Sequence, residues 1–169
     1  AEHGGALGPV YCALIDRALK QALARRETPG HVYFMLDEMR LLPYLPHLED
    51  ALLLGSATGV RILAGAASIA QLRAICPGRE IGALLCAFGT TAAFRLQERD
   101  SRQYVKALYG RHRVVESFTS SVQLRGVIEQ VMDQYIIEDA DLTALQTGEC
   151  IIATMHYPPF YFKLKKYGA

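Results

Sequence analysis

Residues 31–43 read HVYFMLDEMRLLP, and the interpretation of the whole chain starts from this stretch. Val32–Leu36 form an apolar run with the length of a buried strand, and two carboxylates, Asp37 and Glu38, follow directly. In an open parallel sheet, ligands bind beyond the carboxyl ends of the strands. The order of these residues therefore predicts a strand that delivers two acids to a ligand-binding edge.

An Asp-Glu pair at such an edge suits nucleotide chemistry. The aspartate can hold a magnesium ion through water, and the adjacent glutamate can orient or activate the water that attacks a terminal phosphate. This is the pattern of a Walker B strand. The same pair after a strand could also begin a loop or cap a helix, so both interpretations stay open on these residues alone.

The rest of the chain alternates between helical and strand patterns. We expect helices over 6–26, 47–59, 69–76, 80–89, 99–110 and 141–149, and strands over 31–38, 60–68, 90–96 and 112–119. Alternation of this kind predicts an α/β fold with a mainly parallel sheet of about five strands, covered by helices on both faces. Residues 150–167 predict a C-terminal antiparallel hairpin at one edge, whose second strand is half-exposed.

Composition points to one domain and excludes some classes of partner. The chain has 169 residues, of which 51% are hydrophobic, so residues 1–169 can form a single α/β domain. Lys and Arg number 18 against 17 Asp and Glu, which excludes a chain-wide field for nucleic acid or membranes. No apolar run approaches the roughly 20 residues of a membrane span. The widely spaced cysteines predict buried thiols of a cytoplasmic protein: Cys12, Cys76, Cys86 and Cys150.

Three blocks of sequence carry a family resemblance. They are VYFMLDEMRLLPYLPHLEDALLLGSATGVRILAGAASIAQL (32–72), AFGTTAAFRLQERDSRQYVKALYG (87–110) and IIEDADLTALQTGECIIATMHYPPFYFKL (136–164). In order and spacing they resemble the carboxyl-terminal half of the motor domain of type IV secretion coupling proteins, the conjugative DNA-transfer ATPases. The resemblance implies a RecA-like partial nucleotide-binding domain, using ATP and Mg, on the cytoplasmic face of the bacterial inner membrane.

The resemblance also implies partners and roles for residues. The whole protein would be a membrane-anchored homo-hexamer that passes DNA, relaxosome or protein substrates to secretion-channel components. Glu38 would be the catalytic base, Asp37 would hold Mg through water, and Ser68 and Arg95 would lie near the nucleotide. Two positions depart from the family pattern: Ala67 stands where a glutamine is usual, and Ser56 where many members have an arginine. Both departures remove polar groups that would stabilise a transferring phosphoryl group.

A phosphate-binding loop is missing from the sequence. No G-x-x-x-x-G-K-[ST] occurs, because GGALGP lacks the lysine and GAASIAQL lacks both the second glycine and the lysine. We therefore expect the isolated chain to be an inactive monomer that binds no cofactor tightly. The chain is either the Walker B half of a longer membrane-anchored protein, which its start at Ala1 favours, or a degenerate relative.

Several alternatives remain at this stage. A non-hydrolysing RecA-like module that docks substrates or partners explains Ala67 and Ser56, and a DNA-pumping ATPase of chromosome segregation also fits the fold. Residues 111–113, Arg-His-Arg, predict a solvated loop rather than a nucleic-acid contact. The Tyr and Lys residues of 161–167 indicate an edge strand guarded by lysines rather than a single-strand binder. His47 and His156 are expected to pack or hydrogen-bond rather than bind metal.

Overall fold

The computed structural model describes residues 4–25, 30–42, 45–75, 81–119 and 127–165, and it divides into two compact units. The first unit spans residues 1–89 and the second spans residues 90–169. Each has a hydrophobic core of its own. No helix among the described residues is long and apolar enough to cross a membrane.

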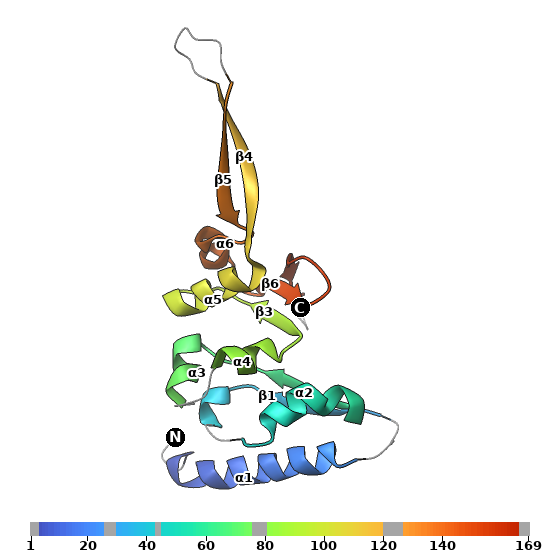
Figure 1. Cartoon of the computed structure of the whole chain (residues 1–169). Coiled ribbons are helices and arrows are strands. Elements are labelled where there is room, and N and C mark those ends of the chain that lie inside the picture. Colours follow the sequence, from blue (N-terminus) through green and yellow to red (C-terminus); the bar gives the residue numbers. More distant parts are fainter. Residues whose placement is uncertain (1–3, 26–29, 43–44, 76–80, 120–126, 166–169) are drawn as a thin grey trace. The chain divides into compact units, whose positions relative to one another are not determined.

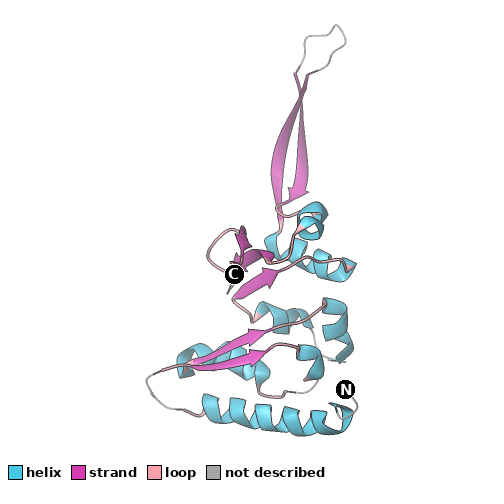
Figure 2. Cartoon of the chain, turned by 180° about the vertical axis from the view of Figure 1, so that it is seen from behind, coloured by secondary structure: helices cyan, strands magenta, loops and turns pink. Residues whose placement is uncertain are grey.

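The first unit is built around two parallel strands (Figures 1 and 2). Strand β1 (Val32–Leu36) pairs with β2 (Val60–Ala64) over its whole length, from Val32 opposite Val60 to Leu36 opposite Ala64. The helices are α1 (Gly4–Leu23), η1 (Met39–Leu41), α2 (Leu48–Thr58), α3 (Ile69–Ile75) and α4 (Ile81–Cys86). Helix α2 ends at Gly59, whose left-handed φ of 75° favours glycine and turns the chain into β2.

Helices cover only one face of this strand pair in the described part of the chain. Phe34, Leu36 and Val60 pack in the core of the unit together with residues of α1, α2, α3 and α4. On the other face, Tyr33, Met35 and Leu63 are 66%, 74% and 67% exposed. The expectation of helices on both faces is therefore wrong for this pair, because alternate side chains of a strand point to opposite faces and one set meets no helix.

The second unit is antiparallel throughout its described strands. Strands β3 (Thr90–Ala93), β6 (Glu149–Thr154) and β7 (Phe160–Lys163) form one sheet in the order β3-β6-β7. Strand β4 (Arg111–Thr119) pairs with β5 (Val127–Tyr135) in a separate two-stranded ribbon that extends away from α5 (Arg99–Tyr109) and α6 (Asp139–Ala144) (Figure 1).

These pairings correct the predicted sheet. Of the described strand pairs, one is parallel and three are antiparallel, so the sheet is not mainly parallel. The predicted α/β class and the antiparallel pairing of β6 with β7 are confirmed. The prediction that the second strand of this hairpin is half-exposed is wrong, since all four residues of β7 are exposed. Strand β5 has no counterpart among the predicted elements.

Other predictions can be compared with the fold one by one. Cys12 and Cys150 are buried as expected, whereas Cys86 is exposed and Cys76 lies outside the described residues. Residues 111–113 begin β4 instead of forming a loop, although their side chains are exposed as predicted. The single domain over residues 1–169 stays a prediction.

Candidate functional site

The carboxyl ends of β1 and β2 meet at one edge, because the two strands run parallel and in register. Asp37 and Glu38 follow β1 at this edge, and residues 65–68 follow β2. The structure thus brings the acidic pair and the segment that ends in Ser68 to the same edge of the strand pair. Strand ends of this kind are where open α/β sheets place ligands.

Backbone hydrogen bonds hold the two strand ends together. The amide N–H of Gly65 donates to the carbonyl oxygen of Leu36 at 2.8 Å, and the N–H of Met39 donates to the carbonyl oxygen of Gly65 at 2.9 Å. The residues on either side of the acidic pair are therefore both bonded to Gly65. This arrangement fixes where the main chain of Asp37 and Glu38 runs relative to β2.

Glu38 has one carboxylate oxygen that is shielded from solvent without a hydrogen bond. Its side chain is 33% exposed, yet Oε1 is buried and has no hydrogen-bond partner among the described residues. The nearest cation, Nε of Arg40, lies 3.7 Å from this oxygen, an ion-pair distance that is too long for a hydrogen bond. A buried acceptor with no partner is costly, and such atoms mark sites that a ligand or water completes.

Capping does not explain Glu38. The residue stands at the N-cap position of η1 with φ −132° and ψ 90°, but its side chain makes no capping hydrogen bond. The alternative in which Glu38 serves as a helix cap is therefore wrong for this residue. Its carboxylate lies at ion-pair distance from Arg40 instead of capping η1.

Asp37 is exposed, and the described residues include no cluster of three metal-ligating side chains. Magnesium usually keeps several waters and is held by one or two carboxylates together with substrate phosphates, so the predicted role of Asp37 does not depend on such a cluster. A protein cage around the ion is not required for that mode of binding. The role of Asp37 itself stays a prediction.

Ser68 has a structural task as well as its predicted role. Its Oγ accepts a hydrogen bond from the N–H of Gln71 at 3.2 Å and so caps the first turn of α3. Ala67 and Ser56 are both exposed, so neither departure from the family pattern is explained by packing. Arg95 lies in the second unit, two residues after β3, and is exposed. Its predicted role near a nucleotide stays a prediction.

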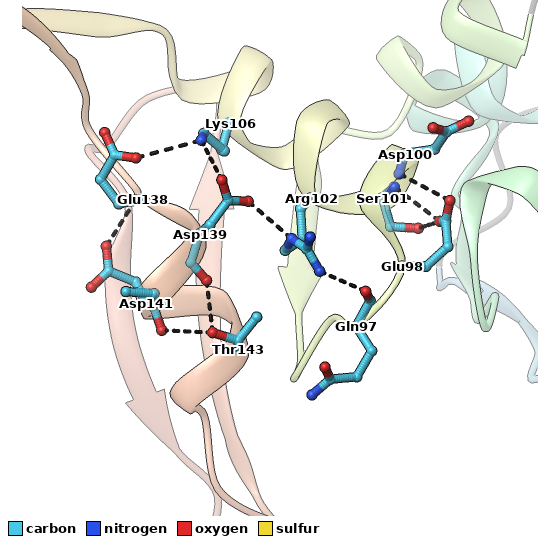
Figure 3. Close-up of polar contacts among 11 residues, drawn as sticks. Gln97, Glu98, Asp100, Ser101, Arg102, Lys106, Glu138, Asp139, Asp141 and Thr143 are labelled. Carbon is cyan, nitrogen blue, oxygen red and sulfur yellow. Dashed lines mark hydrogen bonds and ion pairs between the residues drawn. The ribbon is translucent and has the colours of Figure 1, made fainter.

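A polar cluster in the second unit was missed at the level of sequence (Figure 3). Lys106 of α5, with a side chain only 6% exposed, lies 2.8 Å from Asp139 Oδ2 and 3.4 Å from Glu138 Oε2. Arg102 donates to the other oxygen of Asp139 at 2.9 Å. The hydrogen bond from Lys106 is the main reason that the pKa of Asp139 is lowered, and the bond to Asp139 likewise raises the pKa of Lys106.

The same cluster anchors the base of the β4-β5 ribbon. Nζ of Lys106 lies 4.5 Å from the ring centroid of Tyr135, and the Arg111 guanidinium lies 4.4 Å from the same centroid. Arg111 also donates to the Tyr135 hydroxyl at 2.9 Å, and Glu138 accepts from the Tyr135 N–H at 3.0 Å. These contacts give the charged residues of the cluster a structural role. We therefore do not regard the cluster as a second candidate functional site. Their separation along the chain hid them, since Lys106 and Asp139 are 33 residues apart.

Taken with the fold, the site defines a class: a mixed α/β protein with an acidic pair at the carboxyl edge of two parallel strands. Residues 1–160 match the family described as "Type IV secretion-system coupling protein DNA-binding domain". The chain belongs to this family, which confirms the resemblance found in its sequence. No curated protein matches the chain.

Solved structures of one coupling protein share this fold. The unbound bacterial conjugative coupling protein TrwBdeltaN70 matches with a TM-score of 0.83 and 22% sequence identity, over 97% of this chain and 39% of that chain. The plasmid coupling protein TrwB in complex with ADP and Mg2+ matches with a TM-score of 0.80 and 22% identity, over 99% of this chain and 39% of that one. Its complex with an ATP analogue, ADPNP, matches at 0.78 and 21%, over 97% and 38%. The chain thus spans about two fifths of these structures.

Proposed function

We propose that this chain is the acidic-pair half of a coupling ATPase that drives DNA or protein substrates into a type IV secretion channel. The proposal takes its substrates and its place from the family: secretion-channel components as partners, DNA or relaxosome proteins as cargo, a homo-hexamer as the working state, and the cytoplasmic face of the bacterial inner membrane as the location. The longer protein would also supply the phosphate-binding loop that this sequence lacks.

The observation that carries this proposal is the state of Glu38. Its Oε1 is shielded and has no hydrogen-bond partner among the described residues, and Glu38 follows β1 at the strand edge where open α/β sheets place ligands. A carboxylate in this state fits a catalytic base that waits for the water it will deprotonate. An acid kept only for solubility or capping would be solvated or bonded to a backbone N–H.

Nucleotide with magnesium fits these residues. The solved structures of TrwB include complexes with ADPNP and with ADP and Mg2+. In this chain Asp37 would accept hydrogen bonds from water on the magnesium ion, and Glu38 would orient the attacking water and take its proton. Bound nucleotide would supply the phosphoryl group that is transferred to that water. Ser68 and residues of the missing half would complete the site.

Substitutions in the longer protein test these roles. Glu38→Gln should keep nucleotide binding within about twofold but lower hydrolysis by about 100-fold or more, because an amide cannot take a proton from water. Asp37→Asn should instead weaken magnesium-dependent binding, since it removes a charge opposite the metal. Glu49→Gln and Asp50→Asn, at exposed positions in the first turn of α2, are matched controls and should change neither.

One result would overturn the proposal. If Glu38→Gln leaves both nucleotide turnover and DNA transfer at the wild-type level, the acidic pair is not part of a motor. The second candidate function, a module that docks substrates or partners without hydrolysis, would then stand. It is favoured by the sequence at two exposed positions, Ala67 and Ser56. If those two side chains limit hydrolysis, Ala67→Gln and Ser56→Arg should each raise the turnover rate of a working motor.

A further inference from the structure

Gly65 lies unusually close to the main chain of the acidic pair. A Cβ atom built on Gly65 would lie 2.3 Å from the carbonyl oxygen of Asp37, 3.2 Å from its carbonyl carbon and 3.6 Å from its Cα. Real Cβ atoms essentially never come within 3.0 Å of another heavy atom, and all three contacts are with backbone. No flexible side chain could turn away to make room, so a larger residue at position 65 must shift one of the two backbone segments that meet here and change how Asp37 lies against the end of β2.

Two backbone hydrogen bonds hold Gly65 in this position beside the acidic pair. The N–H of Gly65 donates to the carbonyl oxygen of Leu36, and the carbonyl oxygen of Gly65 accepts from the N–H of Met39. The main chain of Asp37 and Glu38 is therefore held to Gly65 at both of its ends. A Cβ at position 65 would point at the carbonyl group of Asp37, which lies between these two hydrogen bonds. Relief of the clash would therefore change the position of Asp37 and Glu38 relative to the end of β2 rather than that of a distant part of the unit.

We infer that Gly65 is a positioning residue: it sets the acidic pair against the end of β2 by an approach that only glycine permits. This inference rests on the proposed function for the part that concerns turnover. Geometry at catalytic carboxylates matters because a displacement of about 1 Å can cost on the order of 100-fold in rate.

A second glycine of the same unit has no such close approach. Gly82, in α4, has open space around the position of a Cβ. Gly82→Ala is accordingly the matched control, since it adds the same methyl group in the same unit without a clash. Because alanine favours helix over glycine by about 1 kcal/mol, Gly82→Ala should leave the unit at least as stable.

The first experiment uses the 169-residue chain and needs no activity. Amide hydrogen exchange followed by NMR should show the Gly65 and Met39 N–H groups protected by about 100-fold or more relative to an unstructured peptide, as hydrogen-bonded amides are. In Gly65→Ala the protection of Met39 and the amide shifts of Asp37 and Glu38 should change, while Gly82→Ala leaves them as in the wild type. Free exchange of Gly65 and Met39 in the wild type, or unchanged signals in Gly65→Ala, would overturn the inference. If Gly65→Ala does not fold, the wild-type exchange rates decide alone.

The second experiment uses the longer protein and a double-mutant cycle. Gly65→Ala should lower nucleotide turnover by about 100-fold in the wild-type background but by about tenfold or less in the Glu38→Gln background, because the part of its effect that acts through Glu38 is already lost there and only the part through Asp37 remains. Equal losses in both backgrounds would mean a merely structural role and would contradict the inference. If Glu38→Gln itself leaves turnover unchanged, the proposed function is wrong. The hydrogen-exchange experiment then still tests the position of Gly65, because it does not depend on turnover.

Discussion

At the scale of single residues, the carboxylate of Asp16 joins α1 to the start of α2 by hydrogen bonds. Asp16 accepts from the backbone N–H of His47 at 2.8 Å through Oδ1 and lies 2.7 Å from the ring Nδ1 through Oδ2. His47 is the N-cap residue of α2, and its own side chain makes no cap hydrogen bond. Both contacts are partly buried, so they tie the start of α2 to the middle of α1. The expectation that His47 hydrogen-bonds is confirmed.

Removal of this carboxylate should destabilise the first unit. Asp16→Ala should lower the free energy of unfolding by about 1–3 kcal/mol, because two partly buried donors of His47 lose their acceptor. Denaturant unfolding followed by circular dichroism measures the loss. Arg17→Ala, an exposed neighbour on the same helix, is the control and should stay within about 0.5 kcal/mol of the wild type. Equal effects of the two substitutions would show that the Asp16 contacts contribute nothing specific.

At the scale of elements, Glu149 links β6 to β7. Its side chain, 12% exposed, lies 3.1 Å from Lys163 across the strand pair and accepts from the backbone N–H of Gln146 at 2.8 Å. A hydrogen bond from Tyr161, followed by those two contacts, lowers the pKa of Glu149 from 4.5 to about 2. The same bond to Glu149 raises the pKa of Tyr161 from 10.0 to about 12. The ionised acid and the protonated phenol therefore stabilise each other.

This linkage predicts a pH dependence with a definite sign. Because the folded pKa of Glu149 lies below its unfolded value, its contribution to stability is complete above pH 4.5 and is lost as the pH falls toward about 2. The raised pKa of Tyr161 gives the opposite limb: its contribution is complete below pH 10 and is lost as the pH rises through about 12.

Thermal unfolding of the wild type and of Glu149→Gln, from pH 2 to pH 7, measures the acid limb. The difference in Tm between them should be largest near pH 6 and should shrink toward pH 2, because the wild-type carboxylate is then protonated as well. Asp50→Asn, an exposed acid of α2, is the control and should show a much smaller change in that difference. A difference for Glu149→Gln that stays constant over the whole range would contradict the prediction.

At the scale of the whole molecule, the proposed nucleotide site would be formed only in part by this chain. The acidic pair is in place at the strand edge, while the sequence contains no lysine-bearing glycine loop to surround phosphates with backbone N–H groups. A carboxylate pair by itself repels a polyphosphate anion unless a metal ion lies between them. We therefore expect tight binding of nucleotide at the proposed site to require a phosphate-binding half.

The affinity of the chain for nucleotide tests this division of the site. Titration of the 169-residue chain with magnesium-ATP, followed by calorimetry, should give a Kd no better than about millimolar, equivalent to a binding free energy of about −4 kcal/mol. Addition of the phosphate-binding half to the same chain should bring the affinity into the micromolar range. Micromolar binding by the chain alone would mean that it contains a phosphate site that its sequence does not reveal.

Local elements were predicted well, whereas pairing between them was not. Residues 32–36, 60–64 and 99–109 carry their own signals, namely apolar runs bounded by turn residues and, for α5, an end at Gly110. Strand β5 gave no such signal, because each of its faces mixes apolar and polar residues: Val131 and Asp133 share one, Met132 and Gln134 the other. A strand whose one partner among the described strands is β4 needs no apolar face. A search for alternating apolar and polar residues therefore cannot reveal it.

By itself, the sequence determined the family, the acidic pair at the end of β1 and the lack of a phosphate loop, because each is a matter of residue type at short spacing. Only the tertiary structure decided that most of the described strand pairs are antiparallel, that Glu38 Oε1 has no hydrogen-bond partner in the described part of the chain, and that Gly65 lies against Asp37. The physical reason is distance along the chain. Strand direction and close backbone approach depend on how segments tens of residues apart are brought together, and local side-chain patterns carry almost no information about that.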